Sequence, residues 1–167
     1  MYDGSTVEML NSDAEGRMIL ADALAFAKQY KPELVIDVAT LTGAAHRALG
    51  DFAIAYMGTA DAQKKNQLEE SGHEVYERLV GFPLWDEYGD LLKSDIADMK
   101  NVGGALAGHI TAGKFLEKFT DYPWLHLDIA GIAFFQTNQG YKGKHASAFG
   151  VRLLFRFLEK LATTNNG

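Results

Sequence analysis

Apolar residues recur along the chain with two different periods, which alternate from one segment to the next. In residues 15–30 they follow the i, i+3, i+4, i+7 spacing of an amphipathic helix, which Pro32 ends. Thr6–Asn11 and the nearly continuous apolar run Leu34–Ala39 are expected to be strands, the second one covered on both faces. A helix between two strands predicts a right-handed parallel crossover over residues 6–39.

The rest of the chain repeats this alternation. Trp124–Ile129 alternates strictly, so His126 and Asp128 are expected on one face of a strand. The whole pattern favours an α/β layer structure with a partly parallel sheet. Residues 85–101 show no clean period, and Thr163–Gly167 is expected to be a frayed polar tail. The other predicted elements are a loop at Thr40–Gly43, a short helix to Leu49, a strand at Phe52–Met57, and helices at Ala62–Leu79, Ile110–Phe119 and Ser147–Leu161.

Composition narrows the class of protein. The 167 residues are 47% apolar and 23% charged, as in an ordinary globular protein, and they predict a single domain over residues 1–167. The 22 acidic and 16 basic residues leave a net charge of −6, so no nucleic-acid partner is expected. With no cysteine, disulfides and thiolate metal sites are excluded, which fits a cytoplasmic location. No membrane association is expected, because no apolar run is long enough to span a bilayer.

The densest group of chemically capable residues is residues 11–17, between the first predicted strand and the first predicted helix. Open α/β sheets bind ligands at such strand ends. In an extended turn Asp13 and Glu15 project to the same side and offer carboxylate oxygens, which suit manganese, magnesium or zinc. Arg17 adds a permanent cation that can hold an anion or a developing negative charge.

A purely structural explanation of the same residues is also available, and caps are common enough to favour it on chemistry alone. Ser12 and Glu15 have the spacing of a helix capping box, Asp13 is acidic where the helix dipole favours an acid, and Asp13 with Arg17 forms an i, i+4 pair. The spacing alone therefore does not separate a metal site from a helix start.

Other candidate motifs are weaker. Gly103 and Gly108 have the spacing of a phosphate loop, but His109 stands where that loop needs Lys. His126 and Asp128 are expected to be a hydrogen-bonded core pair more often than a ligand pair. Residues 40–43 follow the most apolar strand, and they either line a substrate groove or form a helix turn capped by a Thr.

The acidic turn also matches a known pattern. Residues 11–17, Asn-Ser-Asp-Ala-Glu-Gly-Arg, closely resemble the NTDAEGR signature of the leucine (cytosol) aminopeptidase family, with Ser12 in place of the usual Thr. The likeness continues in order along nearly the whole chain, so it is specific. The further matching blocks are residues 18–24, 37–44, 82–85, 101–104, 111–116, 123–131 and 150–154.

The resemblance implies a three-layer α/β sandwich, with a mixed and largely parallel sheet flanked by helices, as part of a zinc-exopeptidase-like catalytic domain. It implies a hydrolase that removes N-terminal residues, often leucine, from peptides by means of two divalent metal ions, manganese or zinc. Asp13 and Glu15 would bind metal, and Arg17 would hold a bicarbonate-like anion near the bridging water.

The same resemblance assigns a groove for the first residue of the substrate. Thr40, Leu41 and Gly43 would border its side chain and backbone, and Ala130 and Ala133 would form the floor of the pocket. The resemblance also implies a homo-oligomer, which in the family is a hexamer.

Part of the implied site lies outside this sequence. The family's other metal ligands, a Lys and two Asp, and its catalytic Lys precede the signature, and this chain begins too late to contain them. Since even one catalytic zinc takes about three protein ligands, two carboxylates do not complete the centre. We therefore expect the C-terminal portion of a catalytic domain, inactive alone, with an exposed sheet edge that favours self-association.

Two other functions stay open at this point. The corresponding half of these enzymes builds much of the oligomer core, so the chain is alternatively a non-catalytic assembly or binding module. A different α/β metallohydrolase, such as a phosphatase, would act on phosphate esters and not on N-terminal amides.

Overall fold

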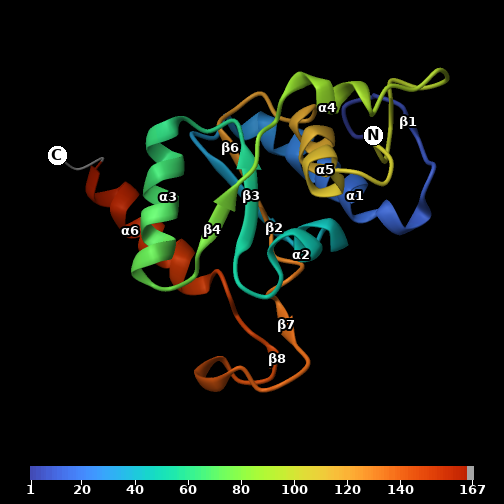
Figure 1. The fold of residues 1–167 in the computed structure, drawn as a ribbon. Coiled ribbons are helices and arrows are strands. Elements are labelled where there is room, and N and C mark those ends of the chain that lie inside the picture. The colour runs from blue at the N-terminus through green and yellow to red at the C-terminus, as the bar shows by residue number, and fades with distance from the viewer. Residues whose placement is uncertain (165–167) are drawn as a thin grey trace.

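The structure, a computed structural model, describes residues 1–164. A mixed sheet of four strands forms its centre (Figure 1). Strands β2 and β6 are parallel, β3 and β4 are parallel, and β3 and β6 are antiparallel, so the predicted mixed and largely parallel sheet is confirmed. In spatial order the strands are β2 (Val35–Ala39), β6 (Trp124–Asp128), β3 (Ile54–Gly58) and β4 (Leu79–Gly81).

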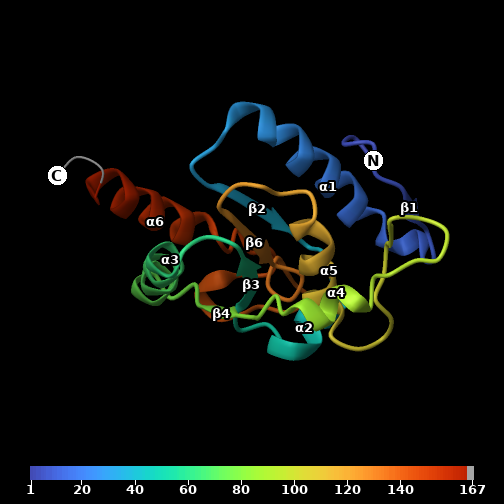
Figure 2. The same cartoon turned by 90° about the horizontal axis from the view of Figure 1, so that it is seen from above.

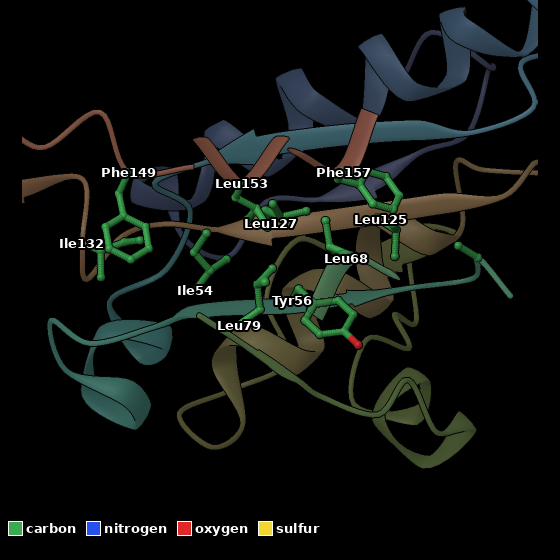
Figure 3. Packing of buried hydrophobic residues seen from close by; sticks show 11 residues of the cluster. Ile54, Tyr56, Leu68, Leu79, Leu125, Leu127, Ile132, Phe149, Leu153 and Phe157 are labelled. Atoms are coloured by element: carbon green, nitrogen blue, oxygen red, sulfur yellow. The ribbon is translucent and has the colours of Figure 1, made fainter. Parts of the chain in front are cut away.

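Helices cover both faces of this sheet and complete the expected three layers (Figure 2). On one face α1 (Gly16–Ala27) and α5 (Gly108–Glu117) bury an apolar cluster that contains Leu24, Phe115 and Trp124. On the other face lie α3 (Ala62–Glu74) and α6 (Val151–Thr164). Figure 3 shows side chains of α6 packed against those of β6, in a cluster that contains Leu68, Leu125, Leu127, Leu153 and Phe157.

The central strand β6 is buried along its whole length. Its sequence gives one apolar and one polar face, and helices cover both, so His126 and Asp128 are buried, as expected for core residues. For the edge strand β2 the prediction is wrong, because its apolar run predicts two covered faces, yet Val38 is 41% exposed. Among the described residues β2 pairs with β6 alone.

The predicted crossover over residues 6–39 is wrong. Strand β1 is only Val7–Glu8, and it pairs in parallel with β5 (Met99–Lys100) in a separate two-stranded sheet. Contacts between distant residues accompany this pairing: Asp98 accepts hydrogen bonds from both the backbone nitrogen and the hydroxyl of Thr6, each at 2.7 Å. A local sequence period carries no information about such partners.

Helix α3 ends earlier than its sequence pattern predicts. It begins where the side chain of Asp61 caps it by accepting from the Lys64 nitrogen at 2.8 Å. It ends at Glu74, after which Tyr76 adopts a left-handed φ of 58° and Glu77 donates its backbone N–H to the Gly72 oxygen. A Cβ at Gly72 would lie 2.6 Å from the Glu77 oxygen, so a glycine is needed where the chain folds back toward β4.

Most of the other predicted elements are confirmed within a few residues. Helix α1 continues as a 3-10 turn, η2 (Lys28–Tyr30), and stops at Lys31, which has a left-handed φ of 47° before Pro32. The predicted α2 (Gly43–Leu49), β2, β3, α5 and α6 are also present. The predicted tail at Thr163–Gly167 is helical to Thr164, and its residues 165–167 lie outside the described part.

Short elements without a clear period are not predicted. Residues 85–101 contain α4 (Asp86–Asp90) as well as β5. A hairpin of β7 (Phe134–Phe135) and β8 (His145–Ala146), with the 3-10 turn η3 (Gly140–Lys142) at its tip, projects from the body of the molecule in Figure 1. Within residues 1–164 no helix has both the length and the apolar character needed to cross a membrane.

Candidate active site

The turn before α1 does not use its acidic residues to build the helix. Asn11 caps the 3-10 turn η1 (Ser12–Ala14), because its side-chain oxygen accepts from the Asp13 nitrogen at 3.0 Å. Glu15 occupies the N-cap position of α1 and makes no side-chain cap bond. The capping-box explanation with Ser12 and Glu15 is therefore wrong.

The two carboxylates of this turn are exposed and without protein partners. Neither Asp13 nor Glu15 accepts a side-chain hydrogen bond or forms an ion pair within residues 1–164, and the i, i+4 pair with Arg17 is absent there too. Acidic side chains with no internal partner keep all their oxygens available for a ligand. The capping-box and ion-pair parts of the structural explanation are therefore wrong, whereas the place of Asp13 in the first turn of η1 still suits the helix dipole.

Arg17 points into the protein and is only 8% exposed. Its Nη1 donates to the backbone oxygen of Asn101 at 2.9 Å, whereas its Nε is buried with no hydrogen-bond partner. Burial lowers the pKa of Arg17, and the negative charge of Asp128 opposes that change. A guanidinium with an unused donor can still bind an anion.

Asn101 holds this turn in place, a role that the sequence analysis misses. Its Oδ1 accepts from the backbone nitrogens of Leu10 and Asn11 at 2.9 and 3.3 Å, and its Nδ2 donates to the Asn11 oxygen at 2.7 Å. Its own backbone oxygen receives Arg17. Its place in one of the matching blocks, residues 101–104, is the signal that points to it.

The loop after β2 lies beside the start of α1. Thr40 and Gly43 are exposed and Leu41 is half-buried. A Cβ at Gly16 would be 3.7 Å from Leu41 Cδ1, so the loop and the acidic turn adjoin. Thr42 caps α2 by accepting from the Ala45 nitrogen at 3.0 Å, which confirms the predicted Thr cap; the substrate groove stays a prediction.

The second predicted substrate segment, residues 130–133, follows β6 and is linked to the loop 40–43. Ala130 and Ala133 are half-buried, and the Ala133 nitrogen donates to the Ile129 oxygen at 3.0 Å. Between them Gly131 packs so closely on α2 that a Cβ there would lie 2.4 Å from the Gly50 oxygen. Asp128 joins this turn to the loop 40–43, because its Oδ1 accepts from both Leu41 and Ala130, and Leu41 in turn lies next to the start of α1.

His126 and Asp128 are buried and hydrogen-bonded as predicted, but not to each other. His126 Nδ1 bonds to Asp37, which also accepts from Trp124 Nε1 at 2.6 Å. Asp128 instead accepts from the loop 40–43 and from Ala130, which makes it part of the candidate site.

His109 is a further polar residue that sequence reasoning passes over. It is 8% exposed, and neither of its ring nitrogens has a hydrogen-bond partner within residues 1–164. Its ring lies edge-on to Phe82 with the centroids 4.3 Å apart. Burial lowers the pKa of His109, and the charge of Asp128 opposes this.

The side chains present fit a metal centre only in part. Asp13 and Glu15 are unpaired hard-oxygen donors of the kind that divalent cations take. Within residues 1–164, however, no group of three or more His, Asp or Glu side chains is arranged to hold a metal ion. Residues 1–164 therefore offer two candidate ligands and no complete set.

The fold and this turn define an α/β domain with an unpaired acidic pair beside a buried arginine at one end of its sheet. Residues 1–155 match the family described as "Cytosol aminopeptidase family, catalytic domain". The chain therefore belongs to the cytosol aminopeptidase family, a family of enzymes.

Individual relatives agree with this assignment. Proteins named "Probable cytosol aminopeptidase" are 50% identical over 159 residues in Geotalea uraniireducens and 53% identical over 159 residues in Chlorobaculum parvum, covering 95% and 93% of this chain. The solved structure of the bottromycin maturation enzyme BotP superposes with a TM-score of 0.91 at 34% identity over 96% of this chain. The chain spans about a third of its relatives, namely 32%, 31% and 36% of these three proteins.

Proposed function

We propose that this chain carries one part of a metal-dependent aminopeptidase site, with Asp13 and Glu15 as metal ligands. The observation that supports it is the turn at residues 12–15, whose two carboxylates are exposed and unpaired although an ordinary helix start would use them. The remaining ligands would come from residues outside this sequence, in line with relatives about three times as long.

The residues around the acidic pair have separate tasks in this proposal. Arg17 supplies a permanent positive charge that holds an anion such as bicarbonate near the carboxylates. Residues 40, 41 and 43 border the N-terminal residue of a peptide, and Ala130 and Ala133 leave space beneath its side chain because they are small. Two bound divalent cations, manganese or zinc, would supply Lewis acidity that activates a water and polarises the scissile carbonyl. Addition of that water to the amide carbon with cleavage of the C–N bond would release an amino acid and a shortened peptide.

A manganese titration of the purified chain, followed by calorimetry, tests the metal ligands. Glu15→Gln and Asp13→Asn should each weaken manganese binding at least about tenfold, because each removes one charged ligand oxygen from the site. Glu33→Gln changes another exposed acid and should bind manganese like the unchanged chain. Equal binding by all variants would refute the assignment.

Hydrolysis of leucyl amide with manganese or zinc tests the activity. We expect no turnover by the chain alone and turnover once the remaining part of a relative's catalytic domain is added, lost again with Glu15→Gln. Turnover by the chain alone would show that its own residues complete the site. Hydrolysis of phosphate esters in place of leucyl amide would favour a phosphatase.

Exposed apolar surface supports assembly as a second candidate role. Val151, Phe155 and Leu158 repeat at helical spacing on α6 and are 64%, 65% and 55% exposed. The edge of β2 pairs with no strand except β6 among the described residues. Both features favour a homo-oligomer, in the cytoplasm that the relatives' names indicate. Sedimentation velocity distinguishes this role, because a monomer at all concentrations would exclude it.

A further inference from the structure

Asp128 stands where the two proposed substrate segments meet. It is the last residue of β6, between β2 and β3 in the sheet, and it is 2% exposed. Its Oδ1 accepts from the backbone nitrogens of Leu41 and Ala130, each at 3.1 Å. One carboxylate oxygen thus sets the distance between the loop after β2 and the turn after β6.

The other oxygen of Asp128 extends the same connection to α2. Oδ2 accepts from the hydroxyl of Thr42 at 2.7 Å. The Thr42 oxygen in turn accepts from the Ala45 nitrogen at 3.0 Å and caps the helix. Since hydrogen bonds to an ionised group are stronger than neutral ones, the negative charge stabilises all three contacts.

The charge of Asp128 also reaches the acidic turn and the buried histidine. Burial lowers the pKa of both Arg17 and His109, and Asp128 opposes the change in each case. A buried carboxylate that accepts three hydrogen bonds from two separate segments is more than a local strand-end contact.

We propose that Asp128 is a positioning residue that holds residues 40–43 and 130–133 at the spacing the substrate groove requires. This inference rests on the proposed function only in assuming that residues 40–43 and 130–133 bind a peptide substrate. The connection itself is a property of the chain that can be measured without metal, substrate or turnover.

Asp37 provides a matched control on the adjacent strand. It is also a buried aspartate, and its carboxylate accepts from Trp124 and His126, within the sheet and away from both loops. Asp37→Asn and Asp128→Asn each remove one buried charge and keep the shape of the side chain. A general loss of stability, without a specific connection between the two loops, predicts the same pattern of change in both variants.

Residue-resolved amide hydrogen exchange on the whole chain, read by NMR, tests the proposal. In Asp128→Asn the amides of Leu41 and Ala130 should exchange about tenfold faster relative to the β3 amides, and their proton signals should move upfield as the charged acceptor is lost. In Asp37→Asn the exchange of these two amides should change only as much as that of β3. Uniform loss of protection in both variants, or unchanged Leu41 and Ala130 in Asp128→Asn, would overturn the proposal.

Substitutions at Thr42 keep the test decisive if Asp128→Asn does not fold. Thr42→Val removes the hydroxyl and should raise exchange of the Leu41 and Ala45 amides about tenfold. Thr42→Ser keeps the hydroxyl and should restore the exchange rates of the unchanged chain. Equal rates in Thr42→Val and Thr42→Ser would contradict the connection. These readouts do not depend on manganese binding, so this inference and the proposed function can fail separately.

Discussion

The acidic residues of the turn before α1 and those of the central sheet differ in what surrounds them. Asp13 and Glu15 are exposed and have no partner within residues 1–164. Asp37 and Asp128 are buried, and each accepts two or more hydrogen bonds from other parts of the chain. The comparison teaches that the sheet's carboxylates are occupied by the fold, whereas those of the turn are free for a ligand.

The largest effect should come from removing a carboxylate of the sheet. Asp37→Ala leaves the Trp124 N–H and the buried imidazole of His126 without their shared acceptor. The free energy of unfolding in urea should fall by about 3 kcal/mol. Asp95→Ala, at an exposed acid in the loop before β5, should change it by less than about 0.5 kcal/mol. Similar values for the two variants would contradict the distinction between acidic residues that have internal hydrogen-bond partners and those that have none.

A smaller effect on the free energy of unfolding should follow from acidification, through His109. Burial lowers the pKa of His109, although the charge of Asp128 opposes the change. Below its ordinary pKa of 6.5 the unfolded chain takes up a proton that the folded chain resists. Stability contributed by neutral His109 is therefore present above pH 6.5 and is lost as the pH falls toward the folded-state pKa.

Urea unfolding between pH 7.5 and pH 5 measures this contribution. His109→Gln should lose less stability on acidification than the unchanged chain, while His73→Gln, at an exposed position of α3, should follow the unchanged chain. An acid dependence that is the same with and without His109 would show that this ring does not resist protonation.

The smallest effect on stability should come from the turn itself. Asp13→Asn and Glu15→Gln remove no internal contact, so each should change the free energy of unfolding by less than about 0.5 kcal/mol. The same two variants should nonetheless weaken manganese binding. A loss of 1 kcal/mol or more in either variant would mean that the carboxylate has a structural partner. That result would count against its assignment as a metal ligand.

Much of the fold and part of the candidate site could be predicted from local signals. The helical spacing from Leu20 to Ala27 is enough for α1, and the Thr cap at residue 42 follows from residue type and position. The acidic turn stands out because three charged groups gather within a few residues. Family resemblance adds the roles of these residues, and the family match over residues 1–155 confirms the family.

Other features could not be predicted because distant residues create them. Strand β1 pairs with β5, and Asp98 binds Thr6, across 92 positions of sequence, and no period in residues 6–11 carries that information. The pattern of β6 indicates core residues at His126 and Asp128, but their partners, Asp37 and the loop 40–43, come from another strand and the loop after it. Asn101 looks like an ordinary loop residue until the backbone of Asn11 lies against it.

The sequence by itself determined where most helices and strands form, the absence of thiol chemistry, and the gathering of Asp13, Glu15 and Arg17 in one turn. These follow from neighbours within a few residues, whose spacing is fixed by the backbone. Only the tertiary structure decided that, within residues 1–164, the carboxylates of Asp13 and Glu15 accept no hydrogen bond, whereas that of Asp128 accepts three. A hydrogen bond such as that from Leu41 to Asp128 joins residues 87 positions apart. Such a bond forms only when the whole sheet and its covering helices have brought its two groups together.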